Sequence, residues 1–191
     1  MDSLRSRAGF VLVGGASSRM GQDKACLPFH GKTLVEHVAE AVAEAAGSVT
    51  LVGAPERYEN LRLPRIPDTR AGWGPLAGIH TALTASRADW NLIVACDMPG
   101  ISGDFLQSLL SAVESSAADC LVPVGPSGRL EPLCAAYHLR CLGAIGAALD
   151  RGVRKVTDGL AGLRTIEWNI AESRWFSNVN TPEEWTRHSH G

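Results

Sequence analysis

Glycines, serines and two cationic side chains gather near the start of the chain, directly after an apolar run. Gly14 to Lys24 reads GGASSRMGQDK. Glycine lets the backbone turn tightly and approach a ligand closely, and successive backbone N–H groups can form a nest for anionic oxygens. Arg19 offers a planar fork for phosphate oxygens, and Lys24 offers a compact charge. The stretch therefore predicts a polyphosphate-binding loop. A polar surface turn with both cations in solvent is the alternative.

Two better-known phosphate motifs do not occur here. A P-loop would need a glycine five residues before Gly31-Lys32-Thr33, where the chain has Cys26. A dinucleotide-binding fingerprint needs G-x-G-x-x-G, which Gly14-Gly15 does not begin. The loop thus belongs to another class of phosphate site.

Asp97 follows the strongly apolar run WNLIVAC. A carboxylate at the end of a strand, across from a phosphate loop, is well placed to hold Mg²⁺, which prefers one or two carboxylates together with phosphate oxygens. An aspartate that only forms the turn before Pro99 is the alternative.

The elements that position these residues alternate between strands and helices. Residues 8–13 predict a strand buried on both faces. Residues 33–46 predict a helix that Thr33 and Glu36 cap and Gly47 ends. Further strands are predicted at 49–53, 63–66, 90–96, 119–124, 132–138 and 163–168 and near Trp175, and further helices from Pro75, at 103–116, 139–151 and 153–160 and after Thr181. This order predicts one α/β domain over residues 1–191, a Rossmann-like three-layer sandwich with a mostly parallel sheet, whose ligands bind beyond the carboxyl ends of the strands. The core should span about 8–187, with the last residues disordered.

The composition narrows the classes of function. The chain has 191 residues, 45% of them hydrophobic, with a formal charge of −2 and a pI near 6.3. A general nucleic-acid binder would carry a basic excess, so that class is not expected. The five cysteines form no CxxC pair and are expected to be reduced. Because no apolar stretch approaches the length of a membrane helix or continues into a signal-cleavage site, we expect a soluble, cytoplasmic protein without a membrane partner.

Several segments together resemble one family. The pattern G-G-x-S-x-R-M-G-x-D-K, the segment CDMP around Asp97, the segment RLEPLCAAYH and the segment NVNTPEEW are similar to those of nucleotidyltransferases related to molybdenum cofactor guanylyltransferase. The resemblance runs from about residue 8 to residue 185. It implies the nucleotidyltransferase fold, with the first glycine loop around a triphosphate.

The resemblance also implies roles for individual residues. The implied nucleotide-binding residues are Leu12, Val13, Gly14, Gly15, Arg19, Gly21, Lys24, Gly53, Asp68, Gly78 and Asp97. Among them Arg19, Lys24 and Asp97 would be catalytic, and Asp97 would bind the Mg²⁺ cofactor. Asp68, in DTRAGWGPLAG, would accept hydrogen bonds from the base or ribose, although an ordinary turn former fits as well. The implied acceptor-binding residues are Arg129, Arg154, Asn178 and Asn180, with Lys155 beside Arg154.

The implied reaction joins GMP from GTP to the phosphate of molybdenum cofactor and releases pyrophosphate. Transient contact with a molybdoenzyme or chaperone would follow. Val13 and Gly53 depart from the alanine and asparagine usual in the family, and both positions bear on base recognition. A CTP-dependent molybdopterin cytidylyltransferase, another small-phosphate nucleotidyltransferase and a non-catalytic nucleotide-binding adaptor are the alternatives.

Overall fold

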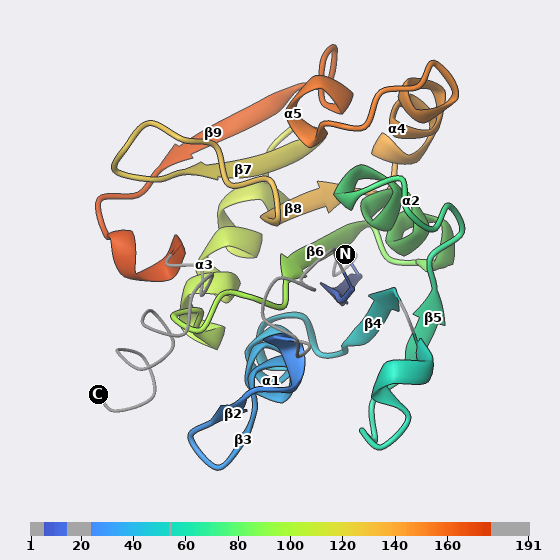
Figure 1. The fold of residues 1–191 in the computed structure, drawn as a ribbon. Helices are drawn as coiled ribbons and strands as arrows, with labels where there is room; N and C mark the ends of the chain where they lie inside the picture. Colours follow the sequence, from blue (N-terminus) through green and yellow to red (C-terminus); the bar gives the residue numbers. More distant parts are fainter. Residues whose placement is uncertain (1–5, 15–23, 54, 177–191) are drawn as a thin grey trace.

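A seven-stranded sheet forms the centre of the computed structural model, which describes residues 6–14, 24–53 and 55–176 (Figure 1). Its strands are β1 (Arg7–Leu12), β4 (Thr50–Gly53), β5 (Arg65–Pro67), β6 (Trp90–Ala95), β7 (Cys120–Val124), β8 (Cys134–His138) and β9 (Thr165–Asn169). They lie in the order β5-β4-β1-β6-β8-β7-β9. A small hairpin, β2 (Pro28–Phe29) and β3 (Lys32–Thr33), stands apart from this sheet.

The sheet is parallel except at one strand. β8 pairs antiparallel with β6 and with β7, whereas every other neighbouring pair is parallel. The predicted mostly parallel sheet is therefore confirmed. Six strands end at one edge, called here the carboxyl edge, and β8 begins there. Ligand sites of α/β sheets lie outside such an edge.

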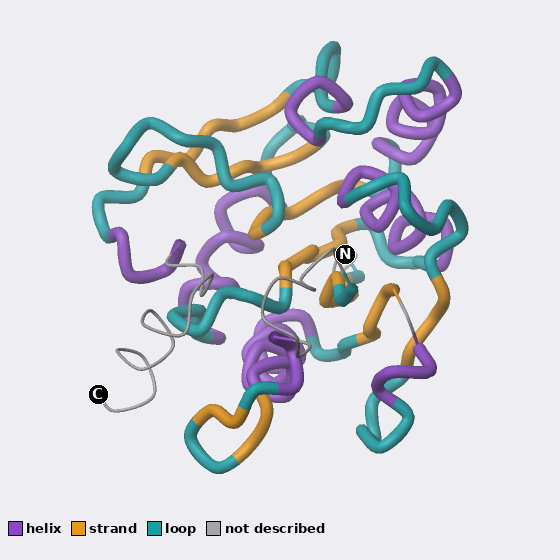
Figure 2. Tube along the Cα trace, in the orientation of Figure 1, coloured by secondary structure: helices purple, strands orange, loops and turns teal. Residues whose placement is uncertain are grey.

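Helices cover both faces of the sheet (Figure 2). They are α1 (Leu34–Ala46), α2 (Pro75–Ala85), α3 (Gly103–Glu114), α4 (Cys141–Asp150) and α5 (Val156–Gly159), with 3₁₀ turns η2 (Lys24–Cys26), η3 (Pro55–Tyr58) and η4 (Ser173–Phe176). α1 and α3 pack together on one face, and α2, α4 and α5 pack on the other. Because side chains alternate along a strand, Val11 of β1 enters the core beneath α1 and α3, while Phe10 enters the core beneath α2. No helix among the described residues has the length and apolar character that crossing a bilayer requires.

Local sequence signals marked both ends of α1 correctly. Thr33 caps α1, since its hydroxyl accepts from the Glu36 backbone N–H while the Glu36 carboxylate accepts from the Thr33 backbone N–H at 2.8 Å. Gly47 ends the helix at φ 76°. These two features confirm the predicted capping box and glycine stop.

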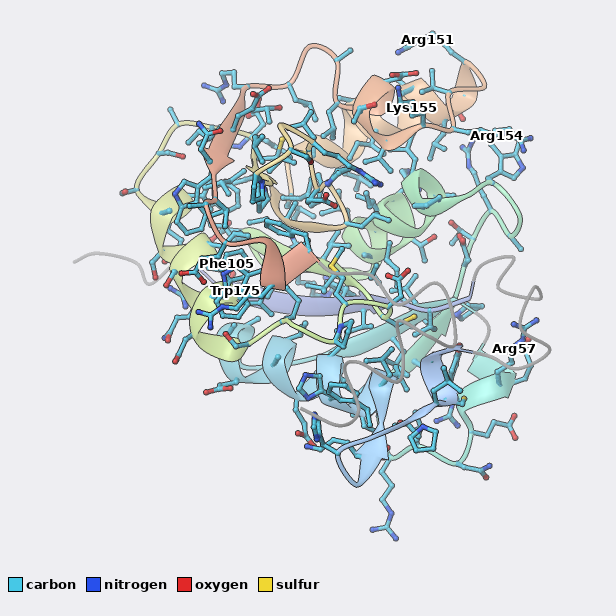
Figure 3. The ribbon with its side chains drawn as sticks, turned by 60° about the vertical axis from the view of Figure 1, so that its left-hand side comes forward. Arg57, Phe105, Arg151, Arg154, Lys155 and Trp175 are labelled. Atoms are coloured by element: carbon cyan, nitrogen blue, oxygen red, sulfur yellow. The ribbon has the colours of Figure 1, made fainter. Side chains whose placement is uncertain are left out.

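The strand predicted near Trp175 is wrong, because this residue lies in η4. The turn lets the Trp175 ring stack on Phe105 of α3, with centroids 5.0 Å apart (Figure 3). Phe105 also stacks on Trp168 of β9, with centroids 6.1 Å apart. Aromatic packing against α3 replaces strand pairing at this point. The predicted helix after Thr181 and the predicted disordered tail lie outside the described residues.

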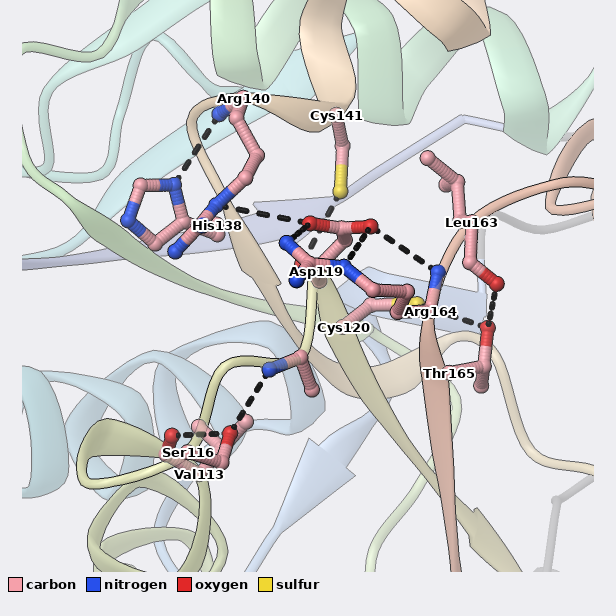
Figure 4. A network of polar contacts seen from close by, with 11 residues as sticks. Val113, Ser116, Asp119, Cys120, His138, Arg140, Cys141, Leu163, Arg164 and Thr165 are labelled. Atoms are coloured by element: carbon pink, nitrogen blue, oxygen red, sulfur yellow. Dashed lines mark hydrogen bonds and ion pairs between the residues drawn. The ribbon is translucent and has the colours of Figure 1, made fainter.

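An ion-pair network joins β9 to β7 at the edge opposite the carboxyl edge (Figure 4). Asp119 is buried and accepts hydrogen bonds from Arg164, at 2.8 Å from Nη2 and 2.9 Å from the backbone N. Arg140 Nε lies 3.5 Å from the same carboxylate. The side-chain and backbone hydrogen bonds from Arg164 lower the pKa of Asp119 from 3.8 to about 2.

Replacing Asp119 with alanine should lower the free energy of unfolding by about 2 kcal/mol near neutral pH, since charge-assisted hydrogen bonds are lost. A carboxyl whose pKa is depressed by folding stabilises the protein above its unfolded pKa, and this stabilisation disappears as the pH falls through the folded pKa. The difference between wild type and variant should therefore shrink from about pH 4 toward pH 2. Urea unfolding across this range measures it, with the exposed Asp89→Ala as control. A difference that is constant with pH would contradict the assignment.

Candidate active site

The carboxyl ends of β4 and β1 lie side by side at the carboxyl edge. Val13 N donates to Val52 O at 2.8 Å, and Asp68 N, just after β5, donates to Gly53 O at 3.2 Å. These backbone bonds hold Val13, Gly53 and Asp68 side by side although they are far apart in sequence. Three of the predicted nucleotide-binding residues are thereby brought to one place.

The end of β6 lies against the other side of β1. Cys96 N donates to Leu12 O at 3.2 Å, and Asp97 follows at once in a turn, half-buried. His37 of α1 supports this turn, since its Nε2 lies 3.0 Å from the carbonyl oxygen of Pro99. Asp97 therefore occupies the position that the sequence predicts for a metal-binding carboxylate, next to the strand that leads into the glycine loop.

The glycine loop itself is described only at its two ends. Gly14 has φ 87°, a conformation that favours glycine, and Lys24 begins η2. Gly15, Arg19, Gly21 and the Lys24 side chain lie outside the described part of the chain, as do Asn178 and Asn180. Their roles stay predictions.

Gly53 and Val13 are in unusually close contact. Gly53 has φ 148°, and a Cβ at this position would overlap the backbone carbonyl oxygen of Val13. The Val13 side chain is buried in the core beneath α1 and α3. Valine in place of alanine at position 13 thus changes the packing of that core. Glycine in place of asparagine at position 53 leaves no side chain to contact a base.

Asp68 is held by the first turns of α2 and by its own loop. Its Oδ1 accepts a hydrogen bond from Thr81 Oγ1 at 2.9 Å and from Arg70 N at 3.0 Å. Thr81 is buried, and its hydroxyl also lies 2.8 Å from Thr69 Oγ1. One carboxylate oxygen is therefore used within the protein, and Oδ2 has no hydrogen bond among the described residues. Sequence reasoning missed Thr81, which no motif marks.

Gly78 lets α2 approach β1. A Cβ at Gly78 would lie 3.3 Å from both methyl carbons of Leu12. The observed contact of Gly78 is thus with Leu12, and the expected contact of both residues with a nucleotide stays a prediction.

The loop between β7 and β8 contains two charged residues, Arg129 and Glu131, and leads into β8, which pairs with β6 on the side away from β1. Arg129 is exposed, whereas Glu131 is buried, and Arg129 Nε lies 3.7 Å from Glu131 Oε1. Burial raises the pKa of Glu131; the Arg129 charge opposes this rise and the Asp97 charge adds to it. Sequence reasoning singled out Arg129 and missed its neighbour, although an acidic residue in the segment RLEPLCAAYH was visible.

Arg154 lies at a different place from Arg129. Its guanidinium carbon is 4.7 Å from the centre of the Trp73 ring, and Arg70 approaches the same ring at 5.6 Å. Trp73 belongs to the loop between Asp68 and α2, so Arg154 stands beside the expected nucleotide loop, at the end of the molecule where Figure 3 also shows Lys155. The structure therefore places Arg154 against the loop that follows Asp68, and Arg129 beside Glu131.

The donors at the carboxyl edge fit a hard divalent cation. Asp97 and Glu131 offer carboxylate oxygens, the ligand type that Mg²⁺ prefers. Within the described residues no group of three or more His, Cys, Asp or Glu side chains gathers for a metal. A cation here would thus take one or two protein carboxylates and complete its shell with phosphate oxygens and water, as Mg²⁺ does in nucleotide sites.

Comparison with known proteins agrees with this geometry. A family model described as the MobA-like NTP transferase domain matches residues 9–165. This range includes the carboxyl ends of β1, β4, β5 and β6. The chain belongs to this family. Its mixed α/β architecture is the nucleotidyltransferase fold, and the strand ends at the carboxyl edge lie within the matched region.

Individual relatives match over nearly the full chain. A protein of Flavobacterium johnsoniae named probable molybdenum cofactor guanylyltransferase is 34% identical and covers 92% of each chain. A protein of the same name from Bacillus cereus is 37% identical and covers 94% of each. The crystal structure of molybdopterin-guanine dinucleotide biosynthesis protein A from Archaeoglobus fulgidus superposes with a TM-score of 0.80 at 28% identity, covering 95% of this chain and 96% of that one.

Proposed function

We propose that this chain is a nucleotidyltransferase that joins GMP from GTP to the phosphate of molybdenum cofactor, with release of pyrophosphate. The observation that carries the proposal is the family match over residues 9–165, together with relatives named for this activity. The geometry supports it, because Gly53 and Asp68 lie on one side of the end of β1 and Asp97 follows β6 on the other side, and β1 leads into the glycine loop.

The reaction needs no general base. The second pKa of a phosphate monoester is about 6, so the acceptor phosphate is largely ionised near neutral pH and can attack the α-phosphorus of GTP directly. The main barrier is the approach of two anions. Arg19 and Lys24 would neutralise the departing pyrophosphate, and Asp97 would hold Mg²⁺, which when bound offsets charge on the phosphate oxygens.

Base selection rests on fewer side chains than in the relatives' usual pattern. Gly53 offers only backbone, and the Val13 side chain faces the core, so Asp68 Oδ2 is the described side-chain group best placed for the base or ribose. A CTP-dependent enzyme or one with another small phosphate acceptor remains the alternative. A non-catalytic adaptor would be expected to lose Asp97 or Lys24, and both are present.

The test is product identification. Purified protein is incubated with molybdenum cofactor, Mg²⁺ and each of the four nucleoside triphosphates, and products are identified by mass. We expect molybdopterin guanine dinucleotide with GTP, pyrophosphate in equal amount, and no product in EDTA. Thermal stabilisation by each triphosphate gives an independent measure of base preference. A cytidine product, or binding of GTP without transfer, would contradict the proposal.

A further inference from the structure

The Glu131 carboxylate is buried and has no hydrogen-bond partner in the described part of the chain. The residue is 8% exposed, and its side chain makes no hydrogen bond among the described residues. Its single ion pair within the described part of the chain, to Arg129 Nε, is 3.7 Å long, and the Arg129 side chain is 73% exposed. A buried charge normally requires hydrogen bonds and a close counter-charge. The long contact to a solvent-exposed arginine supplies neither. The Glu131 carboxylate is therefore suited to pair with a divalent cation that binds together with a nucleotide.

Backbone hydrogen bonds fix where this carboxylate stands. Glu131 N donates to Pro123 O at 2.9 Å, and Ala95 N donates to Leu133 O at 2.7 Å. The segment before β8 thereby runs alongside the end of β6, two residues before Asp97. β6 and β8 pair antiparallel with Val94 opposite Cys134, and this register, continued three residues past Val94, places Asp97 across from Glu131. Two carboxylates that face each other in this way repel, and a divalent cation that binds both stabilises them.

We propose that Glu131 is a second carboxylate ligand, beside Asp97, of the divalent cation that accompanies the nucleoside triphosphate. This inference rests on the proposed function, since the triphosphate supplies the remaining oxygens. Mg²⁺ sites of this type use one or two carboxylates plus phosphate oxygens. Asp97, after β6, would then provide one protein ligand of the cation, and Glu131, in the connection between β7 and β8, would provide the second.

The substitution Glu131→Gln tests this assignment because glutamine keeps the size of the side chain and removes its charge. Without metal, the variant should melt at the same temperature as wild type or higher, since a buried and poorly compensated charge is gone. With metal and nucleotide it should gain less stability than wild type. A purely structural role for Glu131 predicts the reverse pattern, in which the melting temperature falls and the gain on adding metal is unchanged.

The direct measurement is binding of Mn²⁺, followed by electron paramagnetic resonance of the free ion, in the presence of a GTP analogue with a non-cleavable α,β-bridge. We expect Glu131→Gln to weaken Mn²⁺ binding about tenfold or more, and Asp97→Asn to weaken it further. Glu167→Gln, the same change at an exposed position of β9, is the matched control and should bind as wild type does. Equal Mn²⁺ affinity in Glu131→Gln and Glu167→Gln would overturn the proposal, as would a wild type that binds no Mn²⁺ with the analogue.

The outcome is separable from that of the proposed function. If wild type binds Mn²⁺ with nucleotide, Glu131→Gln loses this binding and no dinucleotide product forms, the metal assignment stands and the transfer reaction fails. If wild type forms the product while Glu131→Gln binds Mn²⁺ as tightly as wild type, the transfer reaction stands and the metal assignment fails.

Discussion

Replacing Asp97 with asparagine is expected to slow nucleotidyl transfer about 100-fold, corresponding to about 3 kcal/mol in transition-state free energy. The side chain keeps its size but loses the charge that would hold the cation on the α-phosphate. Since Asp97 lies half-buried in a turn after β6 and not in the core, the fold should survive the change. Steady-state kinetics with GTP and molybdenum cofactor, together with a melting curve, measure both effects.

The control is Asp89→Asn, at an exposed residue just before β6 begins, at the opposite end of the same strand from Asp97. It removes an equal charge and should leave kcat and KM unchanged. The loss in Asp97→Asn should lie mainly in kcat and be partly relieved by higher Mg²⁺ concentration. Transfer at the wild-type rate would remove Asp97 from the catalytic residues and, with it, the proposed metal site.

Replacing Gly53 with alanine is expected to lower the free energy of unfolding by about 3 kcal/mol, the upper part of the range for overpacked positions. The added Cβ would overlap the Val13 carbonyl oxygen, and backbone cannot move aside as a flexible side chain can. The ends of β4 and β1 must separate instead, which disturbs the start of the glycine loop. Urea unfolding measures the loss, and binding of GTP should weaken in parallel.

Gly72→Ala separates the steric overlap from the backbone conformation. Gly72 also has a positive φ, 79°, but a Cβ there would have nothing within 4 Å. Gly72→Ala should therefore lower the free energy of unfolding only by the cost of placing alanine in the left-handed conformation, about 1 kcal/mol. If both variants lose the same stability, the close approach of Val13 is not what requires glycine at position 53.

Sequence patterns were sufficient for the features that depend on near neighbours in the chain. Apolar runs marked the buried strands, and Thr33 with Glu36 marked the start of α1, because hydrogen bonds within one turn determine a helix end. The roles of the glycine loop and Asp97 were predicted on similar grounds, since phosphate and metal sites require particular residue types just after strands, and these roles stay predictions. These signals lie within a few residues of one another, so they can be recognised in the sequence without knowledge of the tertiary structure.

The tertiary structure alone decided which distant residues meet. β8 enters the sheet antiparallel between β6 and β7, and this strand order places the segment that contains Glu131 opposite the end of β6, where Asp97 follows. The hydrogen bond from Thr81 to Asp68 and the contact of Gly53 with Val13 likewise depend on how helices and strands pack. Such contacts arise from strand order, register and close packing across the whole domain, and no spacing within the sequence records them.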